Sequence, residues 1–180
     1  MRVESTSIEG MKKLNLNPSN DLRGKFVKIY NEDIYSESGI SLCIREQYSS
    51  ISNKGVIRGM HFQLPPYDCD KLVTVIDGSV IDVVLDLRKN SSTYLKWQEV
   101  MLCKEKPEAL FIPKGCAHGF LALEDQSCML YNVSSVYNAD FDAGILWNSF
   151  GYEWRETNPL MSSRDQKFPR LEEFNNPFNF

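Results

Sequence analysis

The chain has 180 residues, of which 42% are hydrophobic and 24% charged, and its net charge is −4 at pH 7. This balance excludes the strongly basic surface of a typical nucleic-acid-binding protein and gives no reason to expect an anionic membrane as partner. No apolar run approaches the roughly 20 residues that cross a bilayer.

A chain of this length is most simply one domain, residues 1–180, with 1–20 and 171–180 as peripheral segments. The first five residues contain no apolar core of a signal peptide. The five cysteines include no Cys-x-x-Cys pair, which argues against a disulfide framework and a zinc knuckle. We therefore expect a reduced, cytoplasmic protein.

Strand patterns dominate the chain. The candidate strands are 42–48, 58–63, 71–76, 79–87, 97–103, 109–112, 119–123 and 127–133. Asp77-Gly78 separates two runs rich in β-branched residues and predicts a two-residue hairpin. No stretch between residues 40 and 135 has a 3.6-residue apolar period, so the pattern predicts an all-β sandwich or barrel.

The strand at 58–63 carries His61, one of only two histidines. Strict alternation predicts two faces: Arg58, Met60 and Phe62 on one, and Gly59, His61 and Gln63 on the other. A strand histidine is often only a hydrogen-bonded structural residue. Pro65-Pro66 ends this strand, however, so His61 lies near a rim, where barrels place side chains that face a ligand.

The other histidine lies in Pro113-x-Gly115-x-x-His118, which resembles the second motif of the cupin superfamily of jelly-roll barrels. Cupin metal sites usually take a His-x-His pair from the first motif. That position here reads His61-Phe62-Gln63, so the second imidazole is missing. The resemblance therefore indicates a cupin-type jelly roll used for metal-free chemistry.

Three further residues have plain structural explanations beside a functional one. Lys71 opens a strand, where lysines are usually solvated. Tyr131 lies between apolar residues, as a core tyrosine with a satisfied hydroxyl does. Asp165 follows Ser162-Ser-Arg and is most simply a turn or helix-cap residue.

Taken together, the motifs resemble the dTDP-4-dehydrorhamnose 3,5-epimerases over about residues 20–170. They are, in order, Arg58-Gly-x-His61-x-Gln63, Lys71-Leu-Val, Asp82-Val-Val-Leu-Asp86-Leu-Arg88, Ser91-x-Thr-Tyr, Ile112-Pro-x-Gly-x-Ala-His118-Gly-Phe120, Tyr131 and Trp147-Asn148. The resemblance implies a cupin-type jelly roll with short peripheral helices, a homodimer, no metal or organic cofactor, and a nucleotide-linked 4-keto sugar as substrate.

The resemblance also implies roles for individual residues. His61 matches the base, Asp165 the aspartate that orients it and favours its protonated form, Lys71 the lysine that stabilises an enolate, and Tyr131 the acid on the other face of the sugar. The residues implied to bind substrate are Arg58, Gln63 and His118 in the site, Arg23 at the diphosphate, Tyr137 near sugar and nucleotide, and Phe26 and Lys28 near the base.

The chemistry requires such a set. Carbons 3 and 5 of a 4-keto hexose flank the carbonyl, and their protons are acidic because the carbanion delocalises onto the C4 oxygen as an enolate. The enzyme needs a base poised near neutral pH, a donor or cation at that oxygen, and an acid on the opposite face. Arginines suit the diphosphate, because a guanidinium makes forked, charge-assisted hydrogen bonds.

Two departures from the family's sequence pattern leave the identity of the nucleotide and the sugar open. Lys28 stands where the thymidine-sugar enzymes carry a glutamate; it can only donate, which suits cytosine, or it points to solvent while Phe26 stacks on the base. Asp68 and Asp70 precede Lys71, where they either contact a different sugar or face water.

The sequence thus predicts an epimerase of a nucleotide-linked 4-keto-6-deoxyhexose that inverts C3, C5 or both, in deoxysugar biosynthesis for surface polysaccharide. The leading version acts on both carbons of a dTDP sugar. The alternatives are a single-centre epimerase or one for a CDP-linked sugar, a sugar ketoisomerase on the same barrel, and a sugar-nucleotide-binding protein without activity.

Overall fold

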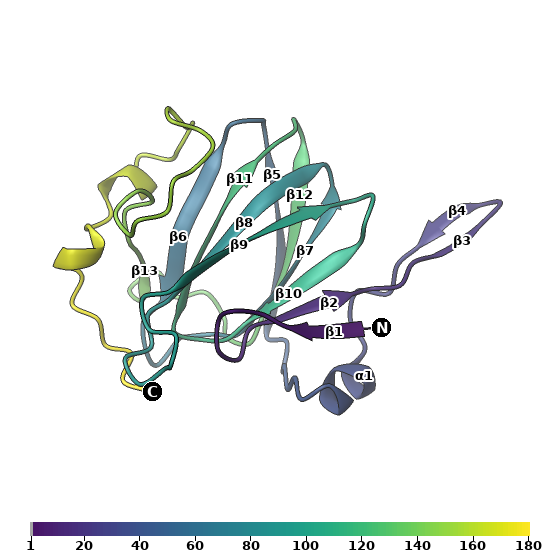
Figure 1. Cartoon of the computed structure of the whole chain (residues 1–180), viewed down its shortest axis with the longest axis horizontal. Coiled ribbons are helices and arrows are strands. Elements are labelled where there is room, and N and C mark those ends of the chain that lie inside the picture. Colours follow the sequence, from purple (N-terminus) through teal and green to yellow (C-terminus); the bar gives the residue numbers. More distant parts are fainter. Residues whose placement is uncertain (1) are drawn as a thin grey trace.

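The computed structural model describes residues 2–180, so Met1, the first residue of the segment 1–20, lies outside the described residues. Two antiparallel sheets pack face to face (Figure 1). The six-stranded sheet has the order β1 (Arg2–Ser5), β2 (Lys12–Asn15), β10 (Glu108–Ile112), β7 (Lys71–Asp77), β12 (Ser127–Val133) and β5 (Glu46–Ser52). The five-stranded sheet has the order β13 (Asp142–Gly144), β6 (Ile57–Gln63), β11 (Cys116–Ala122), β8 (Ser79–Asp86) and β9 (Trp97–Cys103). The predicted all-β jelly-roll class is confirmed.

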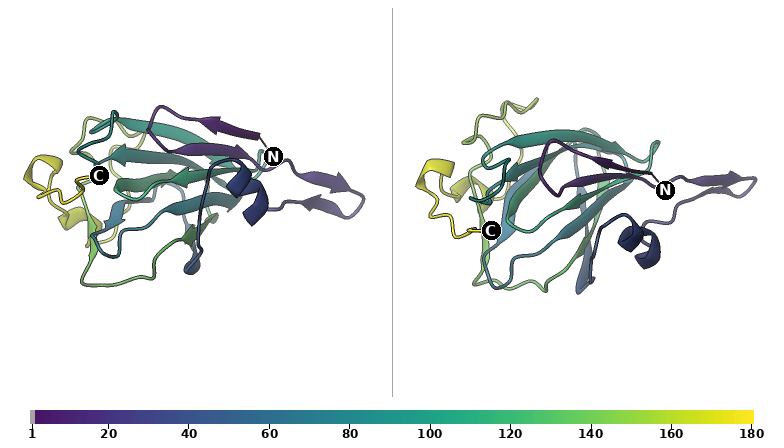
Figure 2. Two further views of the ribbon diagram at one scale, coloured as in Figure 1. Left: turned by 90° about the horizontal axis from the view of Figure 1, so that it is seen from below. Right: turned by 60° about the horizontal axis from the view of Figure 1, so that its bottom comes forward.

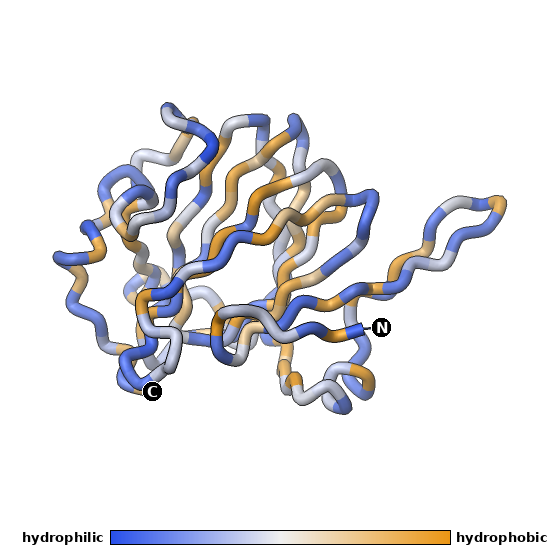
Figure 3. Tube along the Cα trace, in the orientation of Figure 1, coloured by the Kyte–Doolittle hydropathy of each residue, from blue (hydrophilic) through white to orange (hydrophobic). Residues whose placement is uncertain are grey.

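Alternating side chains of the central strands fill two cores. In β8, Val80 and Val84 face the six-stranded sheet, whereas Ile81, Val83 and Leu85 pack against the C-terminal segment. Every residue of β8 is therefore buried. Hydropathy along the trace follows this arrangement, with apolar residues in the barrel strands and hydrophilic residues in many of the loops (Figure 3).

The predicted hairpin at Asp77-Gly78 is wrong. β7 pairs with β10 and β12, whereas β8 pairs with β9 and β11, so the chain passes from one sheet to the other at this turn. Gly78 has φ +72° and packs against Ser127, where a Cβ would lie 2.5 Å from the serine Oγ. Both strands are apolar enough to be covered on two faces, and burial between the sheets outweighs the local turn preference.

Strand ends agree closely with the prediction at 97–103 and 127–133, which are β9 and β12. The strand expected at 42–48 begins only at Glu46, because Leu42 is buried beside the short helix α1 (Glu32–Glu37). Asn31 caps α1 by accepting a hydrogen bond from the Ile34 N–H. With the 3₁₀ turns η1 (Asp165–Lys167) and η2 (Leu171–Glu173), α1 supplies the expected short peripheral helices.

Both ends of the chain join the barrel. β2 pairs with β10 at one edge of the six-stranded sheet, and Leu14 is buried there. Phe178 is buried against the five-stranded sheet. By contrast, the hairpin of β3 (Ser19–Asp21) and β4 (Gly24–Phe26) projects away from the barrel in every view (Figures 1 and 2). Over residues 2–180, the structure contains no helix that is both long and apolar enough to cross a bilayer.

Candidate active site

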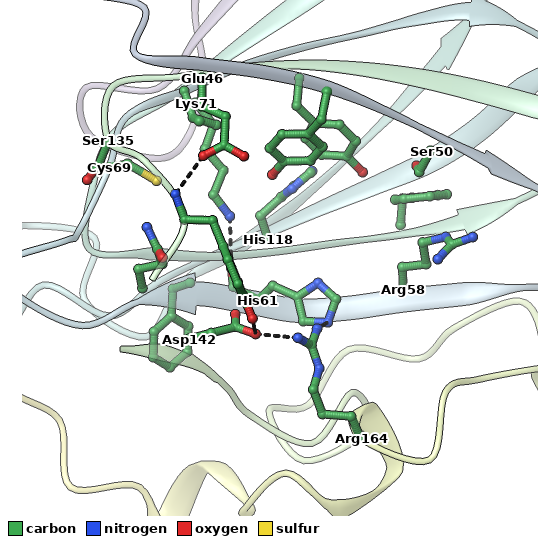
Figure 4. A pocket seen from close by; sticks show the side chains of 17 residues that line it. Glu46, Ser50, Arg58, His61, Cys69, Lys71, His118, Ser135, Asp142 and Arg164 are labelled. Carbon is green, nitrogen blue, oxygen red and sulfur yellow. Dashed lines mark hydrogen bonds and ion pairs between the residues drawn. The ribbon is translucent and has the colours of Figure 1, made fainter. Parts of the chain in front are cut away.

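A cavity of about 330 Å3 opens between the two sheets and brings seven of the predicted residues together. Those seven are Arg58, His61, Gln63, Lys71, His118, Tyr131 and Tyr137. The five-stranded sheet supplies the two histidines, and the six-stranded sheet supplies Lys71, all three of which are labelled in Figure 4. The six-stranded sheet also supplies Tyr131. A ligand between the sheets therefore meets different chemistry on its two faces.

The prediction that Arg58 and His61 lie on opposite faces of their strand is wrong, because both line the cavity. The pairing of β6 with β11 shifts register between His118 and Phe120. At this irregularity Gly59, with φ +134°, approaches Gly119 so closely that a Cβ would lie 2.5 Å from the Gly119 Cα. A bulge of this kind re-aims the following side chains and breaks strict alternation.

His61 is paired with Asp165, which the chain brings back from the start of η1. The His61 Nε2 and Asp165 Oδ2 atoms are 2.9 Å apart, and the Gly59 N–H also donates to Oδ2 at 3.1 Å. Burial opposes ionisation of Asp165, but the hydrogen bonds from His61 and Gly59 outweigh it and hold its pKa well below the usual range.

The surroundings of His61 favour its neutral imidazole form. Burial lowers its pKa below the usual 6.5, and the hydrogen bond to Asp165 opposes this shift only in part. Among residues 2–180, Nδ1 of His61 has no hydrogen-bond partner. A neutral imidazole that donates from Nε2 to Asp165 keeps its lone pair on Nδ1.

Lys71 is a buried cation at the cavity wall. Its Nζ donates to the backbone carbonyl of His61 at 3.0 Å, and the residue is only 8% exposed (Figure 4). Burial lowers the pKa of Lys71, while nearby carboxylates such as Asp142 oppose the shift. An ammonium has three donors, and within the described chain Lys71 uses one, so two remain for a ligand.

Tyr131 stands on the wall opposite His61. Its ring stacks on Tyr48, with ring centroids 4.7 Å apart and an interplanar angle of 16°. Burial raises the pKa of Tyr131 well above 10, so the phenol keeps its proton at neutral pH. It can therefore donate a proton to a substrate carbon that faces it.

His118 lies behind Tyr131, with ring centroids 6.0 Å apart, and opposite His61 in the pairing of β11 with β6. Its Nε2 is 2.6 Å from Oδ2 of Asp82, which is completely buried. The other carboxylate oxygen of Asp82, Oδ1, is buried without a hydrogen-bond partner in the described part of the chain.

Comparison with known proteins identifies the family of the chain. The family profile of dTDP-4-dehydrorhamnose 3,5-epimerase matches residues 5–173. The chain belongs to this family. It is an isomerase, and the family assignment predicted from the sequence is confirmed.

Relatives support this assignment over nearly the whole epimerase. The dTDP-4-dehydrorhamnose 3,5-epimerase of Methanothermobacter thermautotrophicus is 37% identical over 177 residues, covering 96% of this chain and 95% of the relative. That of Shigella flexneri is 41% identical over 154 residues, covering 82% and 85%. The Bacillus anthracis enzyme, solved with TDP and PPi bound, superposes with a TM-score of 0.92 at 35% identity and covers 94% and 99%.

Gln63 and Glu46 hold the loop that carries Tyr137 over the cavity of this epimerase. The Gln63 side chain donates to the Val136 carbonyl and accepts from the Asn138 N–H at 2.7 Å. Glu46 accepts from the Tyr137 N–H at 2.6 Å (Figure 4). Gln63 thus positions the loop, a role that its motif alone did not indicate.

Sequence reasoning missed Glu46, Asp142 and Arg164 as cavity residues. Arg164 contacts Asp142 and also lies 2.9 Å from Nε2 of His61. The sequence offered one signal for Arg164, its position next to Asp165. Asp165 was expected to pair with His61, so a residue beside Asp165 should also lie near His61. Glu46 and Asp142 carried no comparable pattern.

Arg23, Phe26 and Lys28 do not line the cavity of their own epimerase chain. Arg23 is at the tip of the projecting hairpin, where its side chain is 90% exposed and pairs with Asp21 at 2.5 Å. Phe26 is 65% exposed, and Lys28 is exposed as well.

The two acidic residues before Lys71 also lie outside the cavity lining. Asp70 accepts from the Lys114 N–H, and Asp68 lies 3.5 Å from the Lys114 ammonium. The contacts of both carboxylates are with this lysine on the neighbouring β10–β11 turn, and neither carboxylate contributes to the wall that a sugar would meet.

Proposed function

We propose that this epimerase inverts C3 and C5 of a dTDP-linked 4-keto-6-deoxyhexose in deoxysugar biosynthesis. The observation that carries the proposal is the placing of His61 with Asp165 on one wall of the cavity and Tyr131 on the other. The dehydrorhamnose epimerases of Methanothermobacter thermautotrophicus and Shigella flexneri, together with the TDP-bound Bacillus anthracis structure, support the nucleotide and the sugar.

The first step is removal of a proton beside the ketone. His61 takes it on Nδ1, while Nε2 donates to Asp165 at 2.9 Å. Once protonated, the imidazolium is stabilised by the buried carboxylate, as in other histidine–aspartate pairs. Asp165 therefore orients the base and offsets the charge that it acquires.

Lys71 stabilises the enolate that results. Its two free donors face the cavity from a buried position, where an electrostatic interaction is stronger than in water. Because the ammonium is held by the His61 carbonyl at 3.0 Å, its distance from the base is set by the strand itself. The C4 oxygen can then bind beside the base with little reorganisation.

Reprotonation from the opposite face inverts the centre. Tyr131 is protonated at neutral pH and comes from the facing sheet. A single base would tend to return the proton to the face that it left. Two walls with separate proton carriers remove this restriction, and a turn of the sugar ring would expose the second carbon to the same pair.

The diphosphate and nucleotide would bind toward Arg58, Tyr137 and Arg164, which line the same cavity, with His118 lining the sugar site. We further propose a homodimer in which Arg23, Phe26 and Lys28 of the projecting hairpin complete the nucleotide site of the partner. Their exposure and their distance from the cavity lining of their own chain support this arrangement. Light scattering should then give about twice the 20.7 kDa chain mass; a stable monomer would contradict it.

The free state of all five cysteines supports the further proposal of a cytoplasmic, single-domain enzyme. Neither a metal nor an organic cofactor has a place in the proposed chemistry, because base, cation and acid are all side chains of this chain.

Proton NMR in D2O tests the activity directly. With dTDP-4-keto-6-deoxyglucose, deuterium should enter both C3 and C5 while the ketone stays at C4. Migration of the ketone would mean a ketoisomerase. Exchange with only the matching CDP sugar would move the specificity to cytidine and make Lys28 the residue to test.

A second candidate is inversion at C3 alone. ChmJ from Streptomyces bikiniensis, a 3'-monoepimerase, superposes on this chain with a TM-score of 0.87 at 26% identity and covers 93% of it. The same barrel can thus support one inversion instead of two. Deuterium at C3 with none at C5, after complete turnover, would identify this case.

A further inference from the structure

Two groups of opposite chemistry compete for one nitrogen of the proposed base. Nε2 of His61 lies 2.9 Å from Oδ2 of Asp165. It also lies 2.9 Å from Nη2 of Arg164, which approaches the ring of His61 in Figure 4. A carboxylate only accepts hydrogen bonds and a guanidinium only donates them. Nε2 can therefore satisfy Asp165 when it carries a proton or Arg164 when it does not, but never both.

The two outcomes differ in which nitrogen faces the cavity as a base. If Nε2 donates to Asp165, the neutral ring has its lone pair on Nδ1 and can accept a substrate proton. If Nε2 accepts from Arg164, Nδ1 carries the proton and the ring cannot act as a base toward the cavity. The position of Arg164 thus bears on whether His61 is ready to react.

Arg164 is placed to move. Its side chain is 51% exposed, and it lines both the main cavity and a neighbouring one of about 440 Å3. Its remaining contacts are with Asp142, with Oδ1 of Asp165 at 3.3 Å, and with the ring of Phe168, whose centroid lies 5.5 Å from the guanidinium carbon. A diphosphate offers a guanidinium the same forked pairing with a higher charge than a single carboxylate.

We propose that Arg164 is a positioning residue that sets the tautomer of His61 and couples it to ligand binding. In the free enzyme Arg164 competes with Asp165 for Nε2. A bound diphosphate draws the guanidinium away, Nε2 then donates to Asp165, and Nδ1 becomes the base. This inference rests on the proposed role of His61 in proton abstraction.

The charged groups around the imidazole are few. Asp165, Lys71 and Arg164 act on His61, and the ring of Phe168 covers one edge at a centroid distance of 5.7 Å. Lys71 contacts the backbone carbonyl of His61 and neither ring nitrogen. Only Asp165 and Arg164 therefore act directly on the proton at Nε2.

Long-range 1H–15N correlation spectra of the imidazoles report the tautomer directly, and the chain has only two histidines to assign. Arg164→Met should shift His61 toward the tautomer protonated at Nε2 by about tenfold or more, as expected for loss of one charge-assisted hydrogen bond. Saturating dTDP should cause the same shift in the parent protein and little further change in Arg164→Met. His118 should not change on substitution.

Arg155→Met is the matched control, because Arg155 pairs with Glu99 at 3.1 Å and lines neither cavity. It should leave the His61 tautomer unchanged. The proposal is overturned if Arg164→Met and the parent have the same tautomer ratio, or if dTDP shifts the ratio equally in both. The dTDP titration of the parent is independent of how well the variant folds.

Failure of the proposed function would give a different result. If His61→Asn still exchanged deuterium into the sugar, His61 would not be the base, whatever its tautomer did in the presence of dTDP. Tautomer spectra and deuterium exchange therefore test the two ideas separately.

Discussion

The two histidines lie opposite each other on neighbouring strands, and each contacts an aspartate, yet the two pairs have different surroundings. The His61 side chain is 26% exposed and its ring meets both a carboxylate and a guanidinium. The His118 side chain is 3% exposed, and among residues 2–180 its Nε2 has one hydrogen-bond partner, Oδ2 of Asp82 at 2.6 Å.

This difference distinguishes His61, the proposed base, from His118, whose ring is enclosed. A base must reach its substrate and exchange protons, which requires an open face and a carboxylate ready to balance the charge. His118 is enclosed, and its partner Asp82 keeps one buried oxygen without a hydrogen-bond partner within residues 2–180. In the proposed mechanism the His61–Asp165 pair takes part in proton transfer, whereas the His118–Asp82 pair fixes the wall behind Tyr131.

Removing the reactive imidazole should have the largest effect. We expect His61→Ala to lower both deuterium exchange and inversion by about 10²–10⁴-fold, the usual contribution of general acid–base catalysis. Binding of dTDP, measured by calorimetry, should persist because the wall residues remain. Exchange at the parental rate would remove His61 from this role.

Substitution of Asp165, the aspartate paired with His61, should have the second-largest effect on the rate. Asp165→Asn keeps the shape of the side chain but removes the charge that favours a proton on Nε2, so exchange should fall by about 10²-fold. The measurement is the rate of deuterium entry at saturating substrate. An unchanged rate would mean that the Gly59–Asp165 hydrogen bond, at 3.1 Å, is the main function of this carboxylate.

Tyr131→Phe tests whether the opposite wall supplies the acid. Deuterium should still enter the first carbon, because His61 is intact, but the yield of inverted sugar should fall. Stacking on Tyr48 at 4.7 Å is retained by phenylalanine, so the melting temperature serves as the control. Full inversion in the variant would assign the acid to water or to another side chain.

A substitution in the enclosed His118–Asp82 pair should affect the stability of the fold more than the rate of the reaction. Asp82→Asn weakens a buried, charge-assisted hydrogen bond to His118 and should lower the free energy of unfolding by about 1–3 kcal/mol. Deuterium exchange should change less than in Asp165→Asn. A larger loss of rate in Asp82→Asn than in Asp165→Asn would reverse the comparison between the two pairs.

The dependence of kcat/KM on pH should show the smallest effect. Burial lowers the pKa of His61, so the active neutral base should persist on the acid side of 6.5, and activity should rise with pH through that lowered value. Burial also lowers the pKa of Lys71, so the alkaline limb should begin below 10.5. An acid limb above 6.5 would contradict the predicted direction for His61.

Local pattern predicted much of this barrel. The strands at 97–103 and 127–133 were located from β-branched and aromatic residues between turn residues, features that depend on a few neighbours. The hairpin at Asp77-Gly78 failed because pairing depends on which sheet covers each face. The alternation of 58–63 failed because a close approach of Gly59 to Gly119 involves a strand sixty residues away in the chain.

The residues of the site were likewise only partly predictable from the sequence. The motifs alone were enough to name His61, Lys71, Tyr131 and His118, since each lies in a strand that the pattern could place. The competition of Asp165 and Arg164 for one ring nitrogen was beyond such reasoning, because a hydrogen bond depends on distances of a few tenths of an ångström.

The sequence by itself therefore determined the all-β class, most of the strands and the chemical types available for proton transfer. The tertiary structure alone decided which sheet each strand joins, how far each histidine is exposed, and that Asp82 pairs with His118. The physical reason is that propensity and periodicity act over a few residues, whereas burial and hydrogen-bond geometry depend on segments up to a hundred residues apart that only the packed sheets bring together.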